Sequence, residues 1–475
     1  MSFYDNEFSD EEDFDIPPEK IDEEINLCIQ ILDTGYIYDS VERIEDVIQI
    51  CIEHNRYQDG LKFVDRLLEV FPYNSEYWFK KGILLNSLFK FSESLLAYDH
   101  SLSLNPNDVE TLIDKSATEE NLGLYDQAQS TLEKVLELDP DNEDAIFSIG
   151  LLHQRRANFN KAIEYFNKVI LSDPDFSEAY FELGFCYENL GKTKEALDSY
   201  EKLLDVDPYN PNGWYNKGII LAKSNRLEEA INCYDLALSI RENFTSALFN
   251  KGNALADLGR FAEAIICFKK VIEIDPYDDS ACYNLANIYE ELEELSNAIK
   301  YYSEAIKINE ENYDAYFSRG FCYDSIGKYQ LALKDFNKAI ALSQDSAEAW
   351  TAKADLEYSL GQMQDSIKSY KEAVRIEPDN YEIWFNLAET YFEMGEWLGA
   401  LVAYDECIRI HPHDASSFYT KAKINFVLSR TQEAIENLKI AFNLDPSIKL
   451  EFEKEFPEVK SSKLFKRFLG ESLDN

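Results

Sequence analysis

The sequence is poor in basic residues. Its 475 residues contain 46 Lys and Arg against 90 Asp and Glu, which gives a formal net charge of −44. Nucleic acids and anionic membranes are bound mainly through Lys and Arg side chains that displace counterions. We therefore expect no nucleic acid and no membrane as the main partner, and we expect partner proteins or peptides to be basic or apolar.

Long apolar runs and cysteine pairs are also missing. The sequence has no stretch of about 20 apolar residues that could span a bilayer. Its acidic N-terminus, MSFYDNEFSDEEDFDIPPEK, does not have the form of a signal peptide. The 8 cysteines include no CxxC pair and are too sparse for a disulfide scaffold. These absences predict a cytoplasmic protein whose thiols stay reduced.

What the sequence does contain is a regular ladder of prolines. Nine of the 13 prolines are separated by 34 residues or by a multiple of 34. If each occupies position 32 of a repeating unit, twelve units of 34 residues run from Val41 to Ile448. The ladder prolines are Pro72, Pro106, Pro140, Pro174, Pro208, Pro276, Pro378, Pro412 and Pro446.

Four other columns keep the same register, which excludes coincidence. Position 8 is Gly or Ala in ten of the twelve units, position 20 is small in all twelve, position 24 is aromatic in nine, and position 4 is bulky in all but one, which has Cys282. Small residues at positions 8 and 20 let two helices approach closely, and large residues at positions 4 and 24 fill the space beside that contact. We predict one helix over roughly positions 2 to 14 and a second over roughly positions 18 to 31 of each unit.

These columns resemble the tetratricopeptide repeat. Segments such as WYNKGIILAKSNRLEEAINCYDLAL and YNLANIYEELEELSNAIKYYSEAIKI are similar to the consensus of that family. The resemblance implies an all-α, right-handed superhelical solenoid of about twelve helix-turn-helix repeats with helical caps. The predicted parts are an acidic disordered tail (1–18), an N-terminal capping helix (19–40), the repeats (41–448) and C-terminal capping helices (449–475). One departure from the family is a lysine at position 7, where Leu is usual, at Lys81, Lys115, Lys217, Lys251, Lys353 and Lys421.

The resemblance also implies where a partner would bind. In this family the first helix of each repeat lines a concave groove, with positions 2, 5, 6, 9, 12 and 13 pointing inward. Position 5 is aromatic in nine repeats here, and asparagine recurs at positions 6 and 9. A row of Asn amides can hold an extended peptide, because each amide both donates and accepts, while the rings add apolar or cation–π contact. The predicted partner-binding patch is Tyr215, Asn216, Phe249, Asn250, Asn253, Tyr283, Asn284 and Asn287.

Two readings of this patch stay open. Asp257, Glu290 and Glu291 at its rim favour a basic or at least a non-acidic ligand. Equally, a repeat close to the family consensus would contain the same residues even if it bound no ligand.

Other chemistry is disfavoured. Some family members bind acidic chaperone tails with a clamp that needs basic residues at positions 2, 5 and 6. Across the twelve repeats of this sequence, Lys80 is the one basic residue at any of these positions. His411 and His413 flank Pro412 without a third ligand, so we expect no metal and no other cofactor. No nucleophile is paired with a base, and the segments outside the repeats are too short for a catalytic domain.

The sequence thus predicts a non-catalytic scaffold that binds extended peptide segments of partner proteins. The alternative is a regulatory or substrate-recruiting subunit of a separate enzyme, whereas the charge opposes RNA binding. One segment stands apart, KSSKLFKRFL, in which Lys460, Lys463, Lys466 and Arg467 accompany four large apolar residues. We predict a cap helix that faces acidic groups of the repeats, with a weak membrane or nucleic-acid contact as the alternative.

Overall fold

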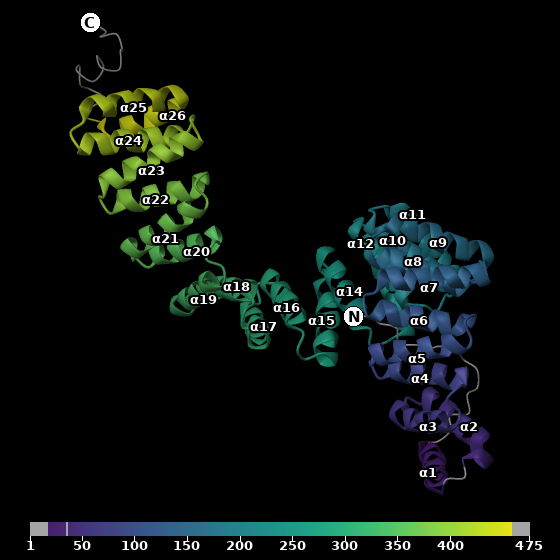
Figure 1. Ribbon diagram of the computed structural model, residues 1–475. Coiled ribbons are helices and arrows are strands. Elements are labelled where there is room, and N and C mark those ends of the chain that lie inside the picture. Colours follow the sequence, from purple (N-terminus) through teal and green to yellow (C-terminus); the bar gives the residue numbers. More distant parts are fainter. Residues whose placement is uncertain (1–17, 35–36, 458–475) are drawn as a thin grey trace. The chain divides into compact units, whose positions relative to one another are not determined.

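The computed structural model describes residues 18–34 and 37–457 (Figure 1). Within these residues the chain forms α-helices α1 to α26, the short 3-10 helix η1 (Tyr38–Ser40) and no strand. The predicted all-α repeat solenoid is confirmed. Most of the predicted acidic tail, and the chain beyond residue 457, lie outside the described residues.

Twelve helix pairs follow one another along the sequence. They are preceded by α1 (Pro18–Thr34) and followed by α26 (Pro446–Glu455). The first helices of the pairs are α2 (Val41–Glu53), α4 (Ser75–Ser87), α6 (Val109–Asn121), α8 (Glu143–Arg155), α10 (Ser177–Asn189), α12 (Pro211–Lys223), α14 (Thr245–Asp257), α16 (Asp279–Glu291), α18 (Tyr313–Ser325), α20 (Ala347–Ser359), α22 (Tyr381–Glu393) and α24 (Ala415–Val427). The second helices are α3 (Tyr57–Val70), α5 (Phe91–Leu104), α7 (Tyr125–Leu138), α9 (Phe159–Ser172), α11 (Thr193–Val206), α13 (Leu227–Ile240), α15 (Phe261–Ile274), α17 (Leu295–Ile308), α19 (Tyr329–Leu342), α21 (Met363–Ile376), α23 (Trp397–Ile410) and α25 (Thr431–Leu444).

Each helix begins one residue earlier than predicted, at position 1 or 17 of its repeat. In eight repeats the last residue of the preceding repeat caps the first helix. A polar side chain there accepts hydrogen bonds from the free amides of the first turn, as Asn142 does from Ala145 at 3.0 Å. The helix therefore starts at position 1. Such caps are Asn74, Asn142, Asn210, Asp278, Asn312, Ser346, Asn380 and Asp414.

The turn inside each repeat depends on one residue in the left-handed conformation. Position 15 has φ between 56° and 74° in all twelve repeats. Six of these residues are glycine, which adopts this conformation without strain. The turn closes each helix pair in the same way along the array, although the sequence at position 15 varies. The residues are Asn55, Phe89, Gly123, Ala157, Gly191, Asn225, Gly259, Glu293, Gly327, Gly361, Gly395 and Ser429.

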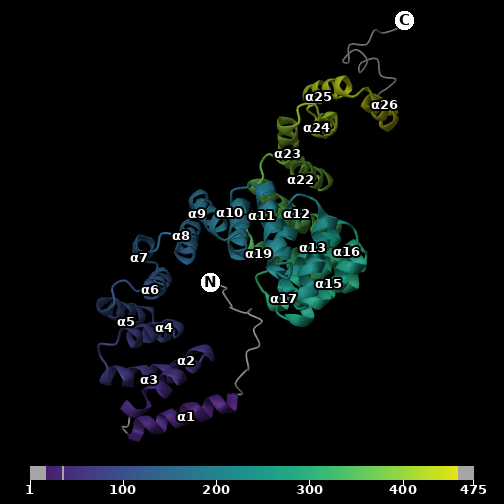
Figure 2. The same cartoon turned by 90° about the vertical axis from the view of Figure 1, so that its right-hand side faces the viewer.

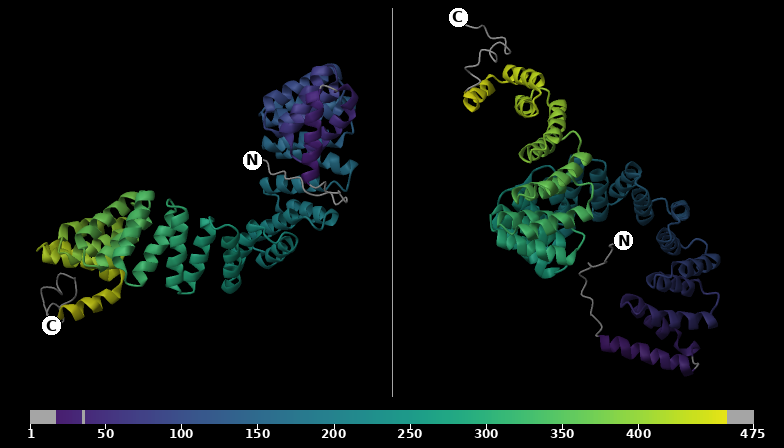
Figure 3. Two further views of the ribbon diagram at one scale, coloured as in Figure 1. Left: turned by 90° about the horizontal axis from the view of Figure 1, so that it is seen from below. Right: turned by 90° about the vertical axis from the view of Figure 1, so that its left-hand side faces the viewer.

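The chain divides into two compact units, Met1–Arg241 and Glu242–Asn475. In unit 1, each helix from α2 to α13 contacts the next, so that the pairs stack (Figure 2). The helices of unit 2, α14 to α26, stack in the same manner (Figure 3). At the beginning of unit 1, α1 packs Ile21, Ile25 and Cys28 into one apolar cluster with Ile44 and Ile48 of α2.

Candidate functional site

The structure places the predicted patch in both units. Tyr215 and Asn216 lie on α12 of unit 1, and the other six residues lie on α14 and α16 of unit 2. All eight side chains are half-buried. The two sets are therefore described separately, and only the unit 2 set is a group of neighbouring residues on adjacent helices.

The aromatic residues of the patch belong partly to the core. The ring of Phe249 packs against Phe268 of α15, with ring centroids 5.6 Å apart, and Tyr283 packs in the same way on Tyr302 of α17 at 5.7 Å. In unit 1, Tyr215 lies 6.1 Å from Tyr234. Position 5 thus packs on position 24 of its own repeat. This contact explains the aromatic column without any ligand and leaves part of each ring for one.

Two asparagines of the patch join neighbouring repeats. The amide nitrogen of Asn284 donates to the amide oxygen of Asn253 at 2.9 Å. The bond leaves the NH₂ group of Asn253 and the oxygen of Asn284 able to make further hydrogen bonds. A donor and an acceptor thus stand side by side on the faces of α14 and α16.

Asn287 has a different environment. The hydroxyl of Tyr302 lies 2.6 Å from the Asn287 oxygen and 2.5 Å from a carboxylate oxygen of Glu290. Burial and the neighbouring Glu290 carboxylate raise the pKa of Tyr302, so the hydroxyl keeps its proton. Asn287 and Glu290 are therefore engaged with a core tyrosine, and Glu290 is less available to a ligand than its rim position predicts.

The same arrangement recurs in repeats 10 and 11. The hydroxyl of Tyr370 donates to Asp355, and that of Tyr404 donates to Glu389. Asp355 and Glu389 occupy position 9, as Asn287 does. A polar side chain at position 9 thus accompanies a buried tyrosine at position 24 in these three repeats, a pairing that can be found in the sequence only by comparing both columns.

Sequence reasoning missed Asp114, which occupies position 6 of repeat 3 on α6. Burial and the nearby Glu110 and Asp108 carboxylates raise its pKa to about 6, although a hydrogen bond with Tyr98 acts to lower it. No basic side chain appears among the groups that shift it. A carboxyl group that titrates near neutral pH thus lies in the same column as Asn216 and Asn284.

The chain also contains cysteines and other groups that could bind a metal. All eight cysteines are buried, and burial raises the pKa of Cys186 to about 12 and that of Cys233 to about 11, which suppresses the thiolate. Within residues 18–34 and 37–457, no three His, Cys, Asp or Glu side chains gather as metal ligands. In the same ranges, no helix is both long and apolar enough to cross a membrane.

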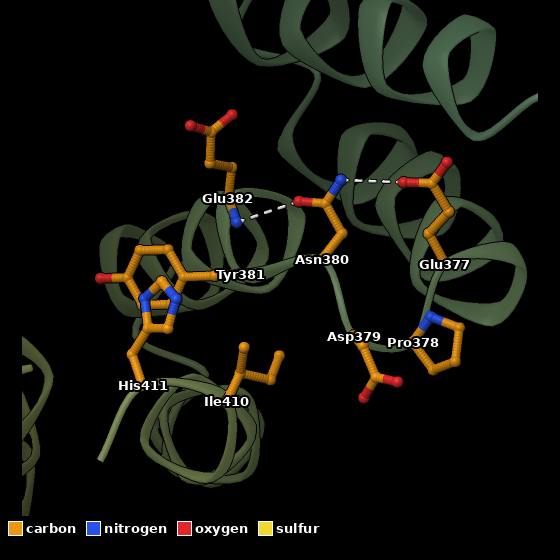
Figure 4. A pocket seen from close by; sticks show the side chains of 8 residues that line it. All are labelled: Glu377, Pro378, Asp379, Asn380, Tyr381, Glu382, Ile410 and His411. Carbon is orange, nitrogen blue, oxygen red and sulfur yellow. Dashed lines mark hydrogen bonds between the residues drawn. The ribbon is translucent and has the colours of Figure 1, made fainter. Parts of the chain in front are cut away.

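An open hollow of about 600 Å³ lies between α21, α22 and the end of α23 (Figure 4). Its polar groups already bond one another. Asn380 caps α22 by accepting from the amide of Glu382 at 3.1 Å and donates to Glu377 at 2.8 Å, and the His411 ring stacks on Tyr381 at 4.5 Å. Lining residues are Glu377, Pro378, Asp379, Asn380, Tyr381, Glu382, Ile410 and His411. The hollow is a feature of the repeat junction, and none of the predicted patch residues lines it.

The comparisons with known families agree with the helix pairs. The tetratricopeptide repeat model matches four successive segments, residues 211–244, 245–278, 280–312 and 313–346. Other TPR models match residues 354–395 and 382–414. The chain is a tetratricopeptide repeat protein. A model described as anaphase-promoting complex, cyclosome, subunit 3, matches residues 121–203 of this TPR protein.

Similar solved structures each match part of the TPR array. MamA is 25% identical over 34% of this chain and 94% of its own, with a TM-score of 0.33. YrrB, described as a TPR protein with an unusual peptide-binding site, is 23% identical over 39% of this chain and 95% of its own, with a TM-score of 0.35. A tetratricopeptide repeat protein from Parabacteroides merdae is 20% identical over 55% of this chain and 97% of its own, with a TM-score of 0.37. No curated protein matches the chain. The repeat family itself indicates a scaffold for protein interactions.

Proposed function

We propose that this TPR protein is a non-catalytic scaffold that binds an extended segment of a partner protein on the first helices of its repeats. The proposed contact residues are Tyr215 and Asn216 in unit 1, and Phe249, Asn250, Asn253, Tyr283, Asn284 and Asn287 in unit 2. The observation that carries the proposal is the Asn284–Asn253 bond. It holds one amide donor and one amide acceptor beside each other, which matches the carbonyl and N–H of a peptide chain.

The charge supports a basic or apolar partner. Asp257 and Glu291 are exposed at the ends of α14 and α16, the two helices that carry the asparagines. With a net charge of −44, the protein repels acidic segments over distances of about 8 Å at physiological salt. Lys or Arg side chains of a ligand would be attracted to this rim.

Affinity capture with paired asparagine variants tests the proposal. Asn253→Ala combined with Asn284→Ala should weaken capture of a partner about tenfold, since two hydrogen bonds of about 0.5 to 1.5 kcal/mol each are lost. The matched control is Asn297→Ala, an exposed asparagine on α17 whose amide bonds only to Glu294 at 2.7 Å. Mass spectrometry identifies the captured proteins, and circular dichroism checks that the variants keep their helices. Equal capture by all three proteins would remove the asparagine pair from the binding surface.

The alternative function is a regulatory or substrate-recruiting subunit of a separate enzyme. In this alternative the repeats supply the binding surface and the partner supplies the chemistry. A single enzyme that copurifies in fixed ratio would support this alternative, whereas a varied set of basic proteins supports the general scaffold.

A further inference from the structure

The last described helix brings the chain onto the inner columns of repeat 12. α26 buries Phe452, which is 4% exposed, against Tyr419 of α24 and Phe442 of α25. Its final residue, Glu455, bonds to the Tyr419 hydroxyl and lies 2.8 Å from the ammonium of Lys423. Tyr419 and Lys423 occupy positions 5 and 9, which belong to the predicted groove. The chain therefore leaves α26 beside the groove.

Apolar surface is exposed at this point. Phe426 and Val427, one turn beyond Lys423 on α24, are 37% and 57% exposed, and Phe456, which follows α26, is 40% exposed. Phe426 occupies position 12, where repeats 10 and 11 carry Tyr358 and Phe392. We call Tyr358, Phe392 and Phe426 the aromatic row. The same position in the first three repeats of unit 2 holds Ala256, Glu290 and Asp324, so the row is confined to the last three repeats.

Acidic side chains border the aromatic row. Glu393, exposed on α22 next to Phe392, hydrogen-bonds the hydroxyl of Tyr358. Asp355 and Glu389 lie one turn away on α20 and α22, and each accepts from a buried tyrosine. The two basic side chains on α24 are already paired, Lys421 with Asp405 and Lys423 with Glu455. The surface around the row is therefore apolar with a negative border.

We propose that residues 460–469 of the same chain bind to this aromatic row and occupy the C-terminal end of the groove. The segment, KSSKLFKRFL, lies outside the described residues. Its sequence supplies Lys460, Lys463, Lys466 and Arg467 for the acidic border, no acidic residue, and four large apolar side chains for the row. Charge and apolar character are both complementary, in a chain whose acidic residues outnumber its basic ones 90 to 46.

The short covalent connection between α26 and residues 460–469 favours this contact. Lys460 lies five positions after Glu455, and a fully extended chain over that interval reaches about 17 Å, which exceeds the 8 to 10 Å between packed helix axes. A short covalent link gives an effective concentration of about 1 mM, so even a weak contact is well occupied. A partner that binds at this end must displace the segment, which lowers its apparent affinity. This contact is separate from the asparagine pair of repeats 7 and 8, and either can fail without the other.

The test uses the full chain and a labelled synthetic peptide of residues 458–475. The variant Phe465→Ala/Phe468→Ala weakens the segment in the chain and should expose the row. We expect the peptide to bind this variant at least tenfold more tightly than it binds the unchanged protein. Adding Val427→Asp to the variant should abolish peptide binding. The matched control, Leu398→Asp on the second helix α23, also places a charge at an exposed apolar residue (62% exposed) and should leave binding unchanged.

Several outcomes would overturn the proposal. Equal peptide binding by the variant and the unchanged protein, or binding to neither, would show that the segment does not occupy the row. Binding that survives both Val427→Asp and the second variant, Phe426→Ser, would place the peptide elsewhere. A dimer that dissociates in Phe465→Ala/Phe468→Ala would assign the segment to a second copy. If the unchanged protein is retained on phosphatidylserine vesicles and Phe465→Ala/Phe468→Ala is not, the segment would be assigned to membrane binding.

Discussion

The residues at positions 8, 9 and 24 of a repeat depend on one another in how they pack. Six repeats have Gly at position 8 beneath an aromatic ring at position 24, and a Cβ built on Gly184 would lie 2.6 Å from the Tyr200 ring. Four repeats have Ala at position 8. In the three of them that also have Tyr at position 24, a polar residue at position 9 bonds to the tyrosine hydroxyl, as Glu389 does to Tyr404 beside Ala388. We infer that the hydrogen bond to the tyrosine hydroxyl fixes the position of the tyrosine ring, and that the ring in this position leaves room for the methyl group of the alanine.

Gly184→Ala tests this coupling. The added methyl group overlaps Tyr200, which is fully buried and cannot move without repacking. We expect a loss of about 1 to 3 kcal/mol in the free energy of unfolding, measured by chemical denaturation. Adding Phe185→Glu reproduces the combination of Ala388, Glu389 and Tyr404 and should recover part of the loss. A double variant no more stable than Gly184→Ala would show that the three positions are independent.

Asp114 predicts a specific pH dependence. Its pKa in the folded protein is raised from 3.8 to about 6, so the folded state holds the proton more tightly than the unfolded state. The contribution of this group to stability is therefore full below about pH 4 and is lost as the pH rises through about 6. A shift of this size corresponds to about 2 to 3 kcal/mol. Asp114→Asn should be more stable than the unchanged protein at pH 7 and similar to it at pH 4.

Thermal melting of Asp114→Asn and of the unchanged protein at pH 4, 5, 6 and 7 measures this effect. Both proteins share all other carboxylates, so the difference between them reports on Asp114. Asp141→Asn serves as the control, because it removes an exposed carboxylate in the loop before α8 and is not among the carboxylates that shift Asp114. A constant difference between Asp114→Asn and the unchanged protein across this range would show that Asp114 titrates normally.

At the scale of helices, ion pairs join successive repeats. In four repeats the lysine at position 7 contacts an acidic residue at position 25 of the preceding repeat, as Lys81 does with Asp65 at 2.7 Å and Lys217 with Glu201 at 3.0 Å. In repeats 2 and 6 the same lysine also lies over the Trp at position 4, with Lys81 5.3 Å from the Trp78 ring. The lysines that depart from the family pattern therefore connect helices α3 to α4 and α11 to α12.

In repeat 9, position 7 is Arg319, whose ion pair lies within the repeat and whose hydrogen bond to Ser303 reaches the preceding one. Arg319 donates two hydrogen bonds to Asp335, at 2.7 and 2.8 Å, and one to Ser303 of the preceding repeat at 2.9 Å. Removing the carboxylate with Asp335→Ala leaves a largely buried guanidinium without its partner, so we expect a loss of about 3 to 5 kcal/mol. Asp65→Ala, at an exposed pair, should cost about 1 kcal/mol or less. Chemical denaturation measures both, and equal losses would show that burial does not strengthen the pair.

Much of the helix pattern was predictable from the sequence, because the contacts that define a repeat lie within 34 residues. The prolines and the small residues at positions 8 and 20 gave the fold class and placed each helix within one residue. The sequence could not show that Tyr215, Phe249 and Tyr283 pack on position 24, since one helix face contains both core and groove residues. It also could not pair Lys217 with Glu201, which requires knowing how two repeats stack.

On the scale of the whole molecule, charge repulsion is the dominant electrostatic effect. Ion pairs such as Lys81–Asp65 neutralise some carboxylates, but 46 basic residues cannot neutralise 90 acidic ones. The excess carboxylates lie closer together in the folded repeats than in an unfolded chain. The folded state is therefore destabilised by self-repulsion, which screening by salt reduces.

The melting temperature should accordingly rise with added salt. Between about 0.01 and 0.15 M, the screening length falls from about 30 Å to about 8 Å, so repulsion between repeats is largely removed while contacts at hydrogen-bond distance are weakened less. Differential scanning calorimetry in sodium chloride and in choline chloride measures the effect. Equal increases in the two salts identify screening, because specific binding of one cation would distinguish them. A melting temperature that stays level or falls would show that the ion pairs between repeats already offset the excess negative charge.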